Sequence, residues 1–342
     1  MQTLTETILD LSRQNMLGKL SPWFTLALER QVESGVFLPP ERLDAVGEAL
    51  IAGLDAYRRE AGLGTAVLGM SGGVDSALTA VLFKRAGWRV VGLTLPIEQN
   101  PEETARGIDA CEALGLEHHN VDLTALYHAG LAALADADPE LRESDAARLR
   151  RGNVRARLRM ITLYNAAASL GGLVASTDNY SELAAGFWTL HGDVGDVSPI
   201  QSLLKSWEVP YLARTLGVPE ATWKATPTDG LATGGTDEQQ IGATYLEWDI
   251  MVAAIQAASG QETAPASLDA LPDRLDPPIA GDLQALEVYA NVTGRMRGNW
   301  FKRINPLQFE HPFADRLKDL ARMDAALFQP ALIKNLVQPR TE

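Results

Sequence analysis

The chain has 342 residues, of which 46% are hydrophobic and 22% charged, so it can bury a sizeable core without covalent staples. Its 30 Lys and Arg against 44 Asp and Glu leave a formal net charge of −14, which argues against bulk nucleic-acid binding. A single cysteine, Cys111, excludes an intrachain disulfide framework and a cysteine zinc site. With no signal-peptide pattern and no membrane-spanning apolar run, we expect a cytoplasmic protein.

Strands alternate with helices through the middle of the chain. Residues 1–60 are expected to be helical, with apolar residues at helix spacing. The expected strands are 65–70, 89–95, 118–123 and 172–176, and the expected helices after residue 60 are 76–86, 107–116, 153–170, 202–216 and 282–296. This alternation predicts an α/β fold, a doubly wound parallel sheet with flanking helices.

Two irregular segments separate the later elements. Residues 222–240 are rich in Thr, Gly and Asp and read as a lid or binding loop, whereas the proline-rich residues 259–282 read as a linker. We therefore expect a helical extension at 1–60, an α/β core at 61–258, and a linker with a C-terminal helical segment at 259–342.

A glycine-rich turn between the first strand and its helix is the sharpest motif. Its residues are Gly69, Met70, Ser71, Gly72, Gly73, Val74, Asp75 and Ser76. The glycines permit positive φ, and backbone N–H groups at a helix N-terminus then point at an oxyanion. Asp75 would repel a phosphate unless a cation such as Mg²⁺ lay between them. The motif therefore predicts a phosphate site with a bridging metal.

Two later segments carry further candidates. Glu182 follows the last predicted strand, where it can face Asp75 as a second metal ligand or simply lie early in a helix capped by Thr177. Lys205 can reach a phosphate or be an ordinary surface lysine. Cys111 lies on an apolar helix face and is expected to be buried and inert.

Six arginines lie between residues 148 and 159, on the predicted helix 153–170 and just before it. Arg151, Arg155 and Arg159 share one helix face. Such a cluster suits a dianionic ligand, because guanidinium groups grip phosphate and carboxylate in fork geometry. A solvated face paired with Glu143 and Asp145 explains it equally well.

The SGGVDS string resembles the loop with which ATP pyrophosphatases grip the pyrophosphate part of ATP. With the later motifs, residues 64–249 and, more thinly, 301–306 resemble the ammonia-dependent NAD synthetase family. The resemblance implies that the Gly69–Ser76 loop binds ATP, with Asp75 and Glu182 as magnesium ligands. It implies further ATP contacts at Thr177, Lys205 and Thr228, and contacts to the substrate deamido-NAD at Arg157, Asp196 and Lys302.

The family's activity is then expected here, on a fold like that of the adenine nucleotide alpha-hydrolases. The resemblance implies that ATP and Mg²⁺ activate the carboxylate of deamido-NAD as an adenylate, with Asp75 and Lys205 as the catalytic residues. Ammonia converts the adenylate to NAD and AMP after pyrophosphate has left. A homodimer is implied, and so is free ammonia, unless a separate glutaminase supplies it.

Three departures from the family pattern keep the substrate open. Leu190 stands where Lys is common and Phe301 where His is common, and an Arg after the second strand is replaced near Thr94. The same chemistry on nicotinate mononucleotide therefore remains an alternative. A non-catalytic adenine-nucleotide sensor is a second one, although it would need neither the Asp75–Glu182 pair nor Lys205.

Overall fold

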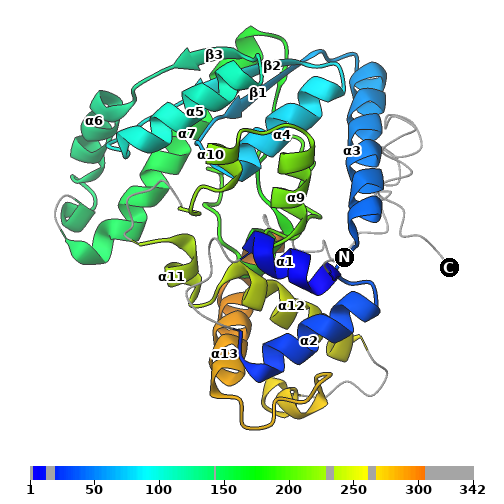
Figure 1. The fold of residues 1–342 in the computed structure, drawn as a ribbon. Coiled ribbons are helices and arrows are strands. Elements are labelled where there is room, and N and C mark those ends of the chain that lie inside the picture. The colour runs from blue at the N-terminus through cyan, green and yellow to red at the C-terminus, as the bar shows by residue number, and fades with distance from the viewer. Residues whose placement is uncertain (1–2, 13–19, 142–143, 229–234, 261–266, 305–342) are drawn as a thin grey trace, which may run out of the picture.

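The computed structural model describes residues 3–12, 20–141, 144–228, 235–260 and 267–304 (Figure 1). The strands are β1 (Thr65–Gly69), β2 (Arg89–Thr94), β3 (Glu117–Asn120) and β4 (Leu173–Val174). The α-helices are α1 (Leu4–Ser12), α2 (Pro22–Glu33), α3 (Pro40–Ala61), α4 (Val74–Arg85), α5 (Pro101–Ala113), α6 (Thr124–Leu134), α7 (Arg148–Ser169), α8 (Tyr180–Ala185), α9 (Glu208–Thr215), α10 (Glu220–Trp223), α11 (Asp237–Ile241), α12 (Tyr245–Ser259) and α13 (Leu283–Gly298). The 3-10 helices are η1 (Pro139–Leu141), η2 (Asp145–Ala147), η3 (Leu268–Ala270), η4 (Pro272–Arg274) and η5 (Trp300–Ile304).

The four strands form one parallel sheet in the order β3-β2-β1-β4. Ala66 in β1 pairs with Val90 in β2 on one side and with Leu173 in β4 on the other. The chain runs outward from β1 to β3 and then returns to the opposite side of β1. This reversal confirms the predicted doubly wound α/β fold.

The two faces of the sheet are covered by different helices. Along β1, Leu68 belongs to the core cluster that includes residues of α4 and α5, whereas Val67 belongs to the cluster that includes residues of α6 and α7. Such alternation follows from the two-residue period of a strand. Cys111 on α5 is fully buried, as expected, and burial raises the pKa of its thiol to about 12.

The N-terminal helices pack onto the rest of the chain. Ile8, Phe24 and Leu43, one from each of α1, α2 and α3, are fully buried in the same cluster as α4. Figure 1 shows α1, α2, α12 and α13 grouped at the end of the molecule away from the sheet, with α3 running beside α9. The division of the chain into parts at residues 60 and 258 stays a prediction, and residues 229–234 and 305–342 lie outside the described residues.

Three helices begin five or six residues from the expected position, and the one expected at 153–170 already begins at Arg148. The helix expected at 107–116 begins at Pro101, because the side chain of Asn100 caps it and proline is favoured at the first helical position. The helix expected at 202–216 begins only at Glu208, whose carboxylate accepts a hydrogen bond from the Leu204 N–H at 2.9 Å. Lys205 therefore lies in a turn rather than on a helix.

None of the helices in the described ranges combines the length and apolar character needed to cross a membrane. The reversal of strand order lies between β1 and β4. In open α/β sheets, ligands bind in the crevice at the carboxyl ends of the strands where the strand order reverses.

Candidate functional site

The turn between β1 and α4 has the geometry of an anion site. Ser71 Oγ accepts a hydrogen bond from the Gly73 N–H at 3.3 Å and lies 3.2 Å from Ser76 Oγ. Gly73 is the N-cap residue of α4 and has an extended conformation. Because glycine has no side chain to cap the helix, the first N–H groups of α4 point out of its N-terminus without a capping acceptor. Backbone donors and two hydroxyls thus converge where a phosphate would carry negative charge.

Gly72 is required by both conformation and space. Its φ is +86°, and a Cβ there would lie 2.3 Å from the backbone oxygen of Glu103. Gly72→Ala is therefore expected to lower the free energy of unfolding by about 2 kcal/mol or more, from left-handed strain and the clash. Urea unfolding measures it. Gly53→Ala, in the interior of α3 with nothing within 4 Å of the added Cβ, is the control and should be neutral or stabilising. Equal effects of the two changes would contradict the prediction.

Lys205 and Asp75 form a buried ion pair next to this turn. Lys205 Nζ donates to Asp75 Oδ2, and Asn179 Nδ2 donates to Asp75 Oδ1 at 3.0 Å. The exposed fractions of the two charged side chains are 6% for Lys205 and 15% for Asp75. Burial would lower the pKa of Lys205, but the carboxylates of Asp75 and Glu182 raise it above its usual value. The lysine is therefore a fixed cation beside the anion site.

Glu182 lies in the first turn of α8, where it takes part in the helix cap and is close enough to Asp75 for their charges to interact. Its carboxylate accepts from the Asn179 N–H at 3.2 Å, and the Asn179 side chain accepts from the Glu182 N–H at 3.0 Å, a reciprocal capping box. The helix cap is thus Asn179, so the expectation that Thr177 caps this helix was wrong. Burial and the negative charge of Asp75 raise the pKa of Glu182 well above its usual value.

The pair of Asp75 and Glu182 has the donor set of a magnesium site. Burial and then the negative charge of Asp75 raise the pKa of Glu182, and a divalent cation between the two carboxylates would relieve their repulsion. Among the described residues no group of three or more His, Cys, Asp or Glu forms a metal cage. Mg²⁺ needs none, because it commonly binds through one or two carboxylates together with water and substrate phosphates.

A cavity of about 880 Å³ opens at the carboxyl ends of the strands and joins these groups. The predicted site residues that line it are Gly69, Met70, Ser71, Gly73, Val74, Asp75, Ser76, Thr177, Glu182, Lys205, Thr228 and Lys302. Its volume is near the upper end for small-molecule sites, about 300–1,000 Å³, so the cavity suits one large ligand or two smaller ones. Thr228 borders it with its hydroxyl donating to Glu103 Oε1 at 2.7 Å.

Lys302, on η5, also lines the cavity. Its Nζ donates to the backbone oxygens of Gly186 at 2.6 Å and Trp188 at 2.5 Å, and it lies 5.3 Å from the centre of the Trp188 ring. Burial lowers the pKa of Lys302 from its usual value. Phe301, one of the departures from the family pattern, also lines the cavity, so η5 contributes both a cation and an aromatic ring.

Two of the predicted substrate contacts do not line the cavity. Arg157 is exposed on α7, and its Nε donates to the backbone oxygen of Leu190 at 3.3 Å. Asp196 accepts from Tyr164 OH at 3.0 Å and from the Val174 N–H at 2.8 Å, which fastens the residue 196 segment to β4. Their roles toward a substrate stay predictions.

Most of the arginine cluster has protein partners. Arg155 pairs with Glu98 at 2.5 Å and lies over the Tyr127 ring, and Arg150 pairs with Asp138 at 3.0 Å. Arg159 is the member that lines the cavity, with its Nε donating to the backbone oxygen of Leu95 at 3.1 Å. The cluster is thus largely a structural surface with one guanidinium turned to the site; Glu143 lies outside the described residues.

Several cavity residues were missed by sequence reasoning. They include Asp178, Asp193, Asp237 and Arg295. Asp193 and Asp196 belong to one short loop, and no sequence signal separates them, because the hydrogen bond that the Val174 N–H donates to Asp196 forms only in the folded structure. Arg159 was recognisable as one helical turn beyond the buried Arg155.

The carboxyl of Asp178 titrates near neutrality. It is 8% exposed and accepts from Ser176 Oγ at 3.1 Å, and burial together with the charges of Asp193 and Asp75 raises its pKa from 3.8 to about 7. Between about pH 4 and pH 7 the folded protein therefore keeps a proton that the unfolded chain has released. The contribution of Asp178 to the free energy of unfolding is fully present below about pH 4 and is lost as the pH rises to 7.

Asp178→Asn is expected to flatten this pH dependence. The difference between the free energies of unfolding at pH 4.5 and pH 7.5 should shrink by at most about 4 kcal/mol, the full shift of about three pKa units. Urea unfolding of both proteins at the two pH values without divalent cations measures it. The same difference in the variant and the parent would contradict the assignment of this titration to Asp178.

Comparisons with known proteins agree with the architecture and the loop. The family model described as NAD synthase matches residues 46–271. The NH(3)-dependent NAD(+) synthetase of Methanosarcina acetivorans is 39% identical over 209 residues, which cover 59% of this chain and 78% of that protein.

Two solved structures resemble about four fifths of this chain. One is described as the NMN synthetase from Francisella tularensis, with a TM-score of 0.61, 28% identity, and coverage of 81% of this chain and 100% of that one. The other is the NH3-dependent NAD synthetase from Campylobacter jejuni, with a TM-score of 0.58, 26% identity, and coverage of 78% and 99%. On the family match and these likenesses, the chain belongs to the NAD synthase family.

Proposed function

We propose that this chain is an ATP-dependent ligase that converts deamido-NAD and ammonia to NAD, releasing AMP and pyrophosphate. The observation that carries the proposal is one cavity that is lined by the Ser71–Ser76 loop, the Lys205–Asp75 pair, Glu182 and Lys302. The family membership supports the reaction, since relatives of this chain are named NH(3)-dependent NAD(+) synthetases.

In the first step the carboxylate of the acceptor attacks the α-phosphate of ATP. A bond forms from a carboxylate oxygen to phosphorus, and the bond from phosphorus to the β-phosphate oxygen breaks, so pyrophosphate leaves with the electron pair. The loop N–H groups and the Ser71 and Ser76 hydroxyls hold the departing phosphates. Lys205 places a desolvated positive charge where negative charge grows, which stabilises the transition state.

Magnesium fits the site beside the phosphates. Asp75 and Glu182 would hold it, and when bound it would neutralise the charge of the phosphates and relieve the repulsion between the two carboxylates. Asn179 supports both ligands, because its amide donates to Asp75 while its backbone and side chain hold Glu182.

In the second step ammonia attacks the carbonyl carbon of the adenylate. The carbon–nitrogen bond forms, AMP leaves with the electron pair of the carbon–oxygen bond, and one proton is released. Lys302, with its lowered pKa and its place beside the Trp188 ring, is positioned to contact the acceptor rather than ATP. A cytoplasmic location, a homodimer and ammonia supplied free or by a separate glutaminase belong to the same proposal.

The mononucleotide alternative remains a defined outcome of the test. The structure from Francisella tularensis is described as an NMN synthetase, so nicotinate mononucleotide is the competing acceptor. The names of the matched relatives favour the dinucleotide. A nucleotide sensor is less well supported, because the site keeps Asp75, Glu182 and Lys205 together at the phosphate loop.

Pyrophosphate release from the purified chain with ATP, Mg²⁺ and ammonium tests the proposal. Three parallel reactions contain deamido-NAD, nicotinate mononucleotide or no acceptor, and chromatography identifies the nucleotide formed. We expect release and NAD formation with deamido-NAD. Release with the mononucleotide alone would change the substrate but keep the chemistry, and no release with either acceptor would overturn the proposal.

A further inference from the structure

The backbone around Lys205 is held by side chains instead of by a helix. Because α9 begins at Glu208, neither Lys205 nor Ser206 lies in it. The Lys205 N–H donates to Ser181 Oγ at 3.0 Å, and the Ser206 N–H donates to Asp249 Oδ2 at 3.1 Å. Both hydrogen bonds are buried, so breaking either one would leave a backbone N–H without a partner, because water does not reach it.

Asp249 joins these two bonds into one network. It lies on α12 with 1% of its surface exposed, and its Oδ1 accepts from Ser181 Oγ at 2.5 Å. Ser181 therefore bridges Oδ1 of Asp249 to the Lys205 N–H. The other carboxylate oxygen, Oδ2, accepts directly from the Ser206 N–H. Burial raises the pKa of Asp249 to about 6, against the hydrogen bonds from Ser181 and Ser206, so near pH 8 it is ionised and can accept both.

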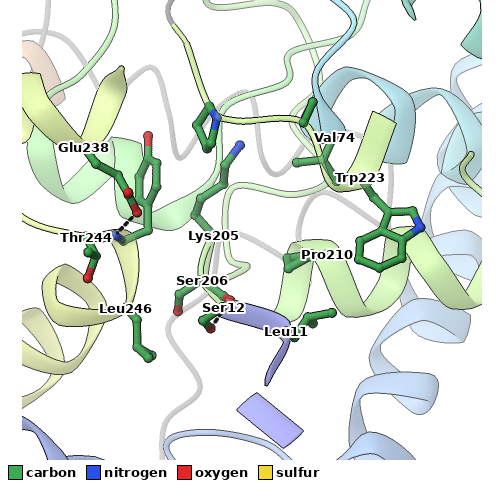
Figure 2. A pocket seen from close by; sticks show the side chains of 13 residues that line it. Leu11, Ser12, Val74, Lys205, Ser206, Pro210, Trp223, Glu238, Thr244 and Leu246 are labelled. Atoms are coloured by element: carbon green, nitrogen blue, oxygen red, sulfur yellow. Dashed lines mark hydrogen bonds between the residues drawn. The ribbon is translucent and has the colours of Figure 1, made fainter. Parts of the chain in front are cut away.

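The far side of the same peptide is held by the N-terminal helix. Ser12 on α1 donates through its Oγ to the backbone oxygen of Ser206 at 2.9 Å, which Figure 2 shows as a dashed line below the side chain of Lys205. Ser206 is thus held at both its N–H and its C=O, by α12 and α1, two helices that lie far apart in the sequence. These two hydrogen bonds restrain the backbone next to Lys205, which suits a lysine whose ammonium group must point in one direction.

Ser181 also immediately precedes Glu182. A single buried carboxylate on α12 therefore anchors the segments that carry two of the charged groups at the phosphate loop, Lys205 and Glu182. Neither oxygen of Asp249 contacts the cavity itself, since this residue is not among those that line it. Its effect on the reaction would have to pass through the residues that it holds.

We propose that Asp249 is a positioning residue that, through Ser181 and the Ser206 N–H, fixes the backbone of Lys205 so that its ammonium group is aimed at the transferring phosphate. This inference rests on the proposed function. In Asp249→Asn one acceptor oxygen becomes an NH₂ group that faces the donors of Ser181 or Ser206. The aim of Lys205 is then lost while its charge remains.

A double-mutant cycle on pyrophosphate release tests the proposal. The variants are Asp249→Asn, Lys205→Ala and the double variant, with kcat expressed per folded site. Asp249→Asn is expected to lower kcat by about 10- to 100-fold, since misplacing a catalytic group by about 1 Å costs up to about 100-fold. KM for deamido-NAD should stay within about threefold, because Lys302 and its surroundings are untouched. In the Lys205→Ala background the same change should lower kcat less than about twofold.

Glu247→Gln is the matched control. Glu247 is a buried acid two residues earlier on α12, and its carboxylate accepts hydrogen bonds from the hydroxyl of Thr244 and from the side-chain amide of Gln284. It should lower the free energy of unfolding but keep kcat per folded site within about twofold. Ser181→Ala provides a second cycle with Lys205→Ala if Asp249→Asn fails to fold.

The proposal would be overturned if Asp249→Asn lowered kcat by the same factor in the Lys205→Ala background as in the parent protein. The same cycle is run on the affinity for a non-hydrolysable ATP analogue, measured by calorimetry, where coupling between the two positions is again expected. This arm needs no acceptor. If the parent protein releases no pyrophosphate, the proposed function fails, while coupled or independent losses in analogue affinity still support or overturn the role of Asp249.

Discussion

Asp75→Asn is expected to lower the rate of pyrophosphate release by about a thousandfold or more at saturating substrates. The change removes one of two carboxylate ligands from the proposed magnesium site, and a bound metal ion contributes several kcal/mol of charge stabilisation, each 1.36 kcal/mol being tenfold in rate. Asparagine keeps an oxygen that can accept from Asn179, so the local shape survives. The measurement is kcat with ATP, Mg²⁺, deamido-NAD and ammonium.

The fold is expected to tolerate this substitution. Burial and then the charge of Asp75 raise the pKa of Glu182, so removing that charge favours the ionised form of Glu182 beside Lys205. Asp55→Asn is the control, since Asp55 pairs with Arg58 and Arg59 on α3, away from the cavity. It should leave kcat unchanged. If Asp75→Asn kept kcat within tenfold of the parent value, Asp75 would not be a ligand of an essential metal.

Lys205→Ala should lower kcat by about 100- to 1,000-fold. This is the usual loss when one preorganised group that stabilises transition-state charge is removed from a water-excluded site. KM for deamido-NAD should change little, because Lys205 contacts Asp75 at the phosphate loop, whereas the proposed contact to the acceptor is Lys302. Steady-state kinetics with each substrate varied separate the two parameters.

Added Mg²⁺ should increase the free energy of unfolding of the Lys205→Ala variant. Without the lysine charge, Asp75 and Glu182 lose their buried cation, so at pH 8 the free energy of unfolding should fall and added Mg²⁺ should restore part of it. Lys224→Ala is the control, because Lys224 pairs with Glu220 at the surface and should alter neither quantity appreciably. A Lys205→Ala protein with parental kcat would remove Lys205 from the mechanism.

Features that depend on neighbours in the chain could be predicted from the sequence. The strand, the glycine turn and α4 form one local unit, and residues 69–76 carry its geometry in their own conformational preferences, as the positive φ of Gly72 illustrates. The alternation of strands and helices likewise predicted the doubly wound sheet, because a parallel strand must be followed by a crossover.

Features that depend on contacts between residues far apart in the chain could not be predicted from the sequence. Lys205 was expected on a helix, but the turn that aims it is held by Asp249 and Ser12, which lie 43 and 194 positions from their partner Ser206. No local pattern encodes such a contact.

The sequence by itself determined the fold class, the phosphate loop and the family. The tertiary structure alone decided which charges meet. It turned Arg159 but not Arg157 into the cavity, tied Asp196 to β4, and paired Lys205 with Asp75. The physical reason is that backbone preferences and hydrophobic periodicity are local. Burial, and with it the pairing and proton affinity of each charged group, is set by segments that meet only when the whole chain has packed.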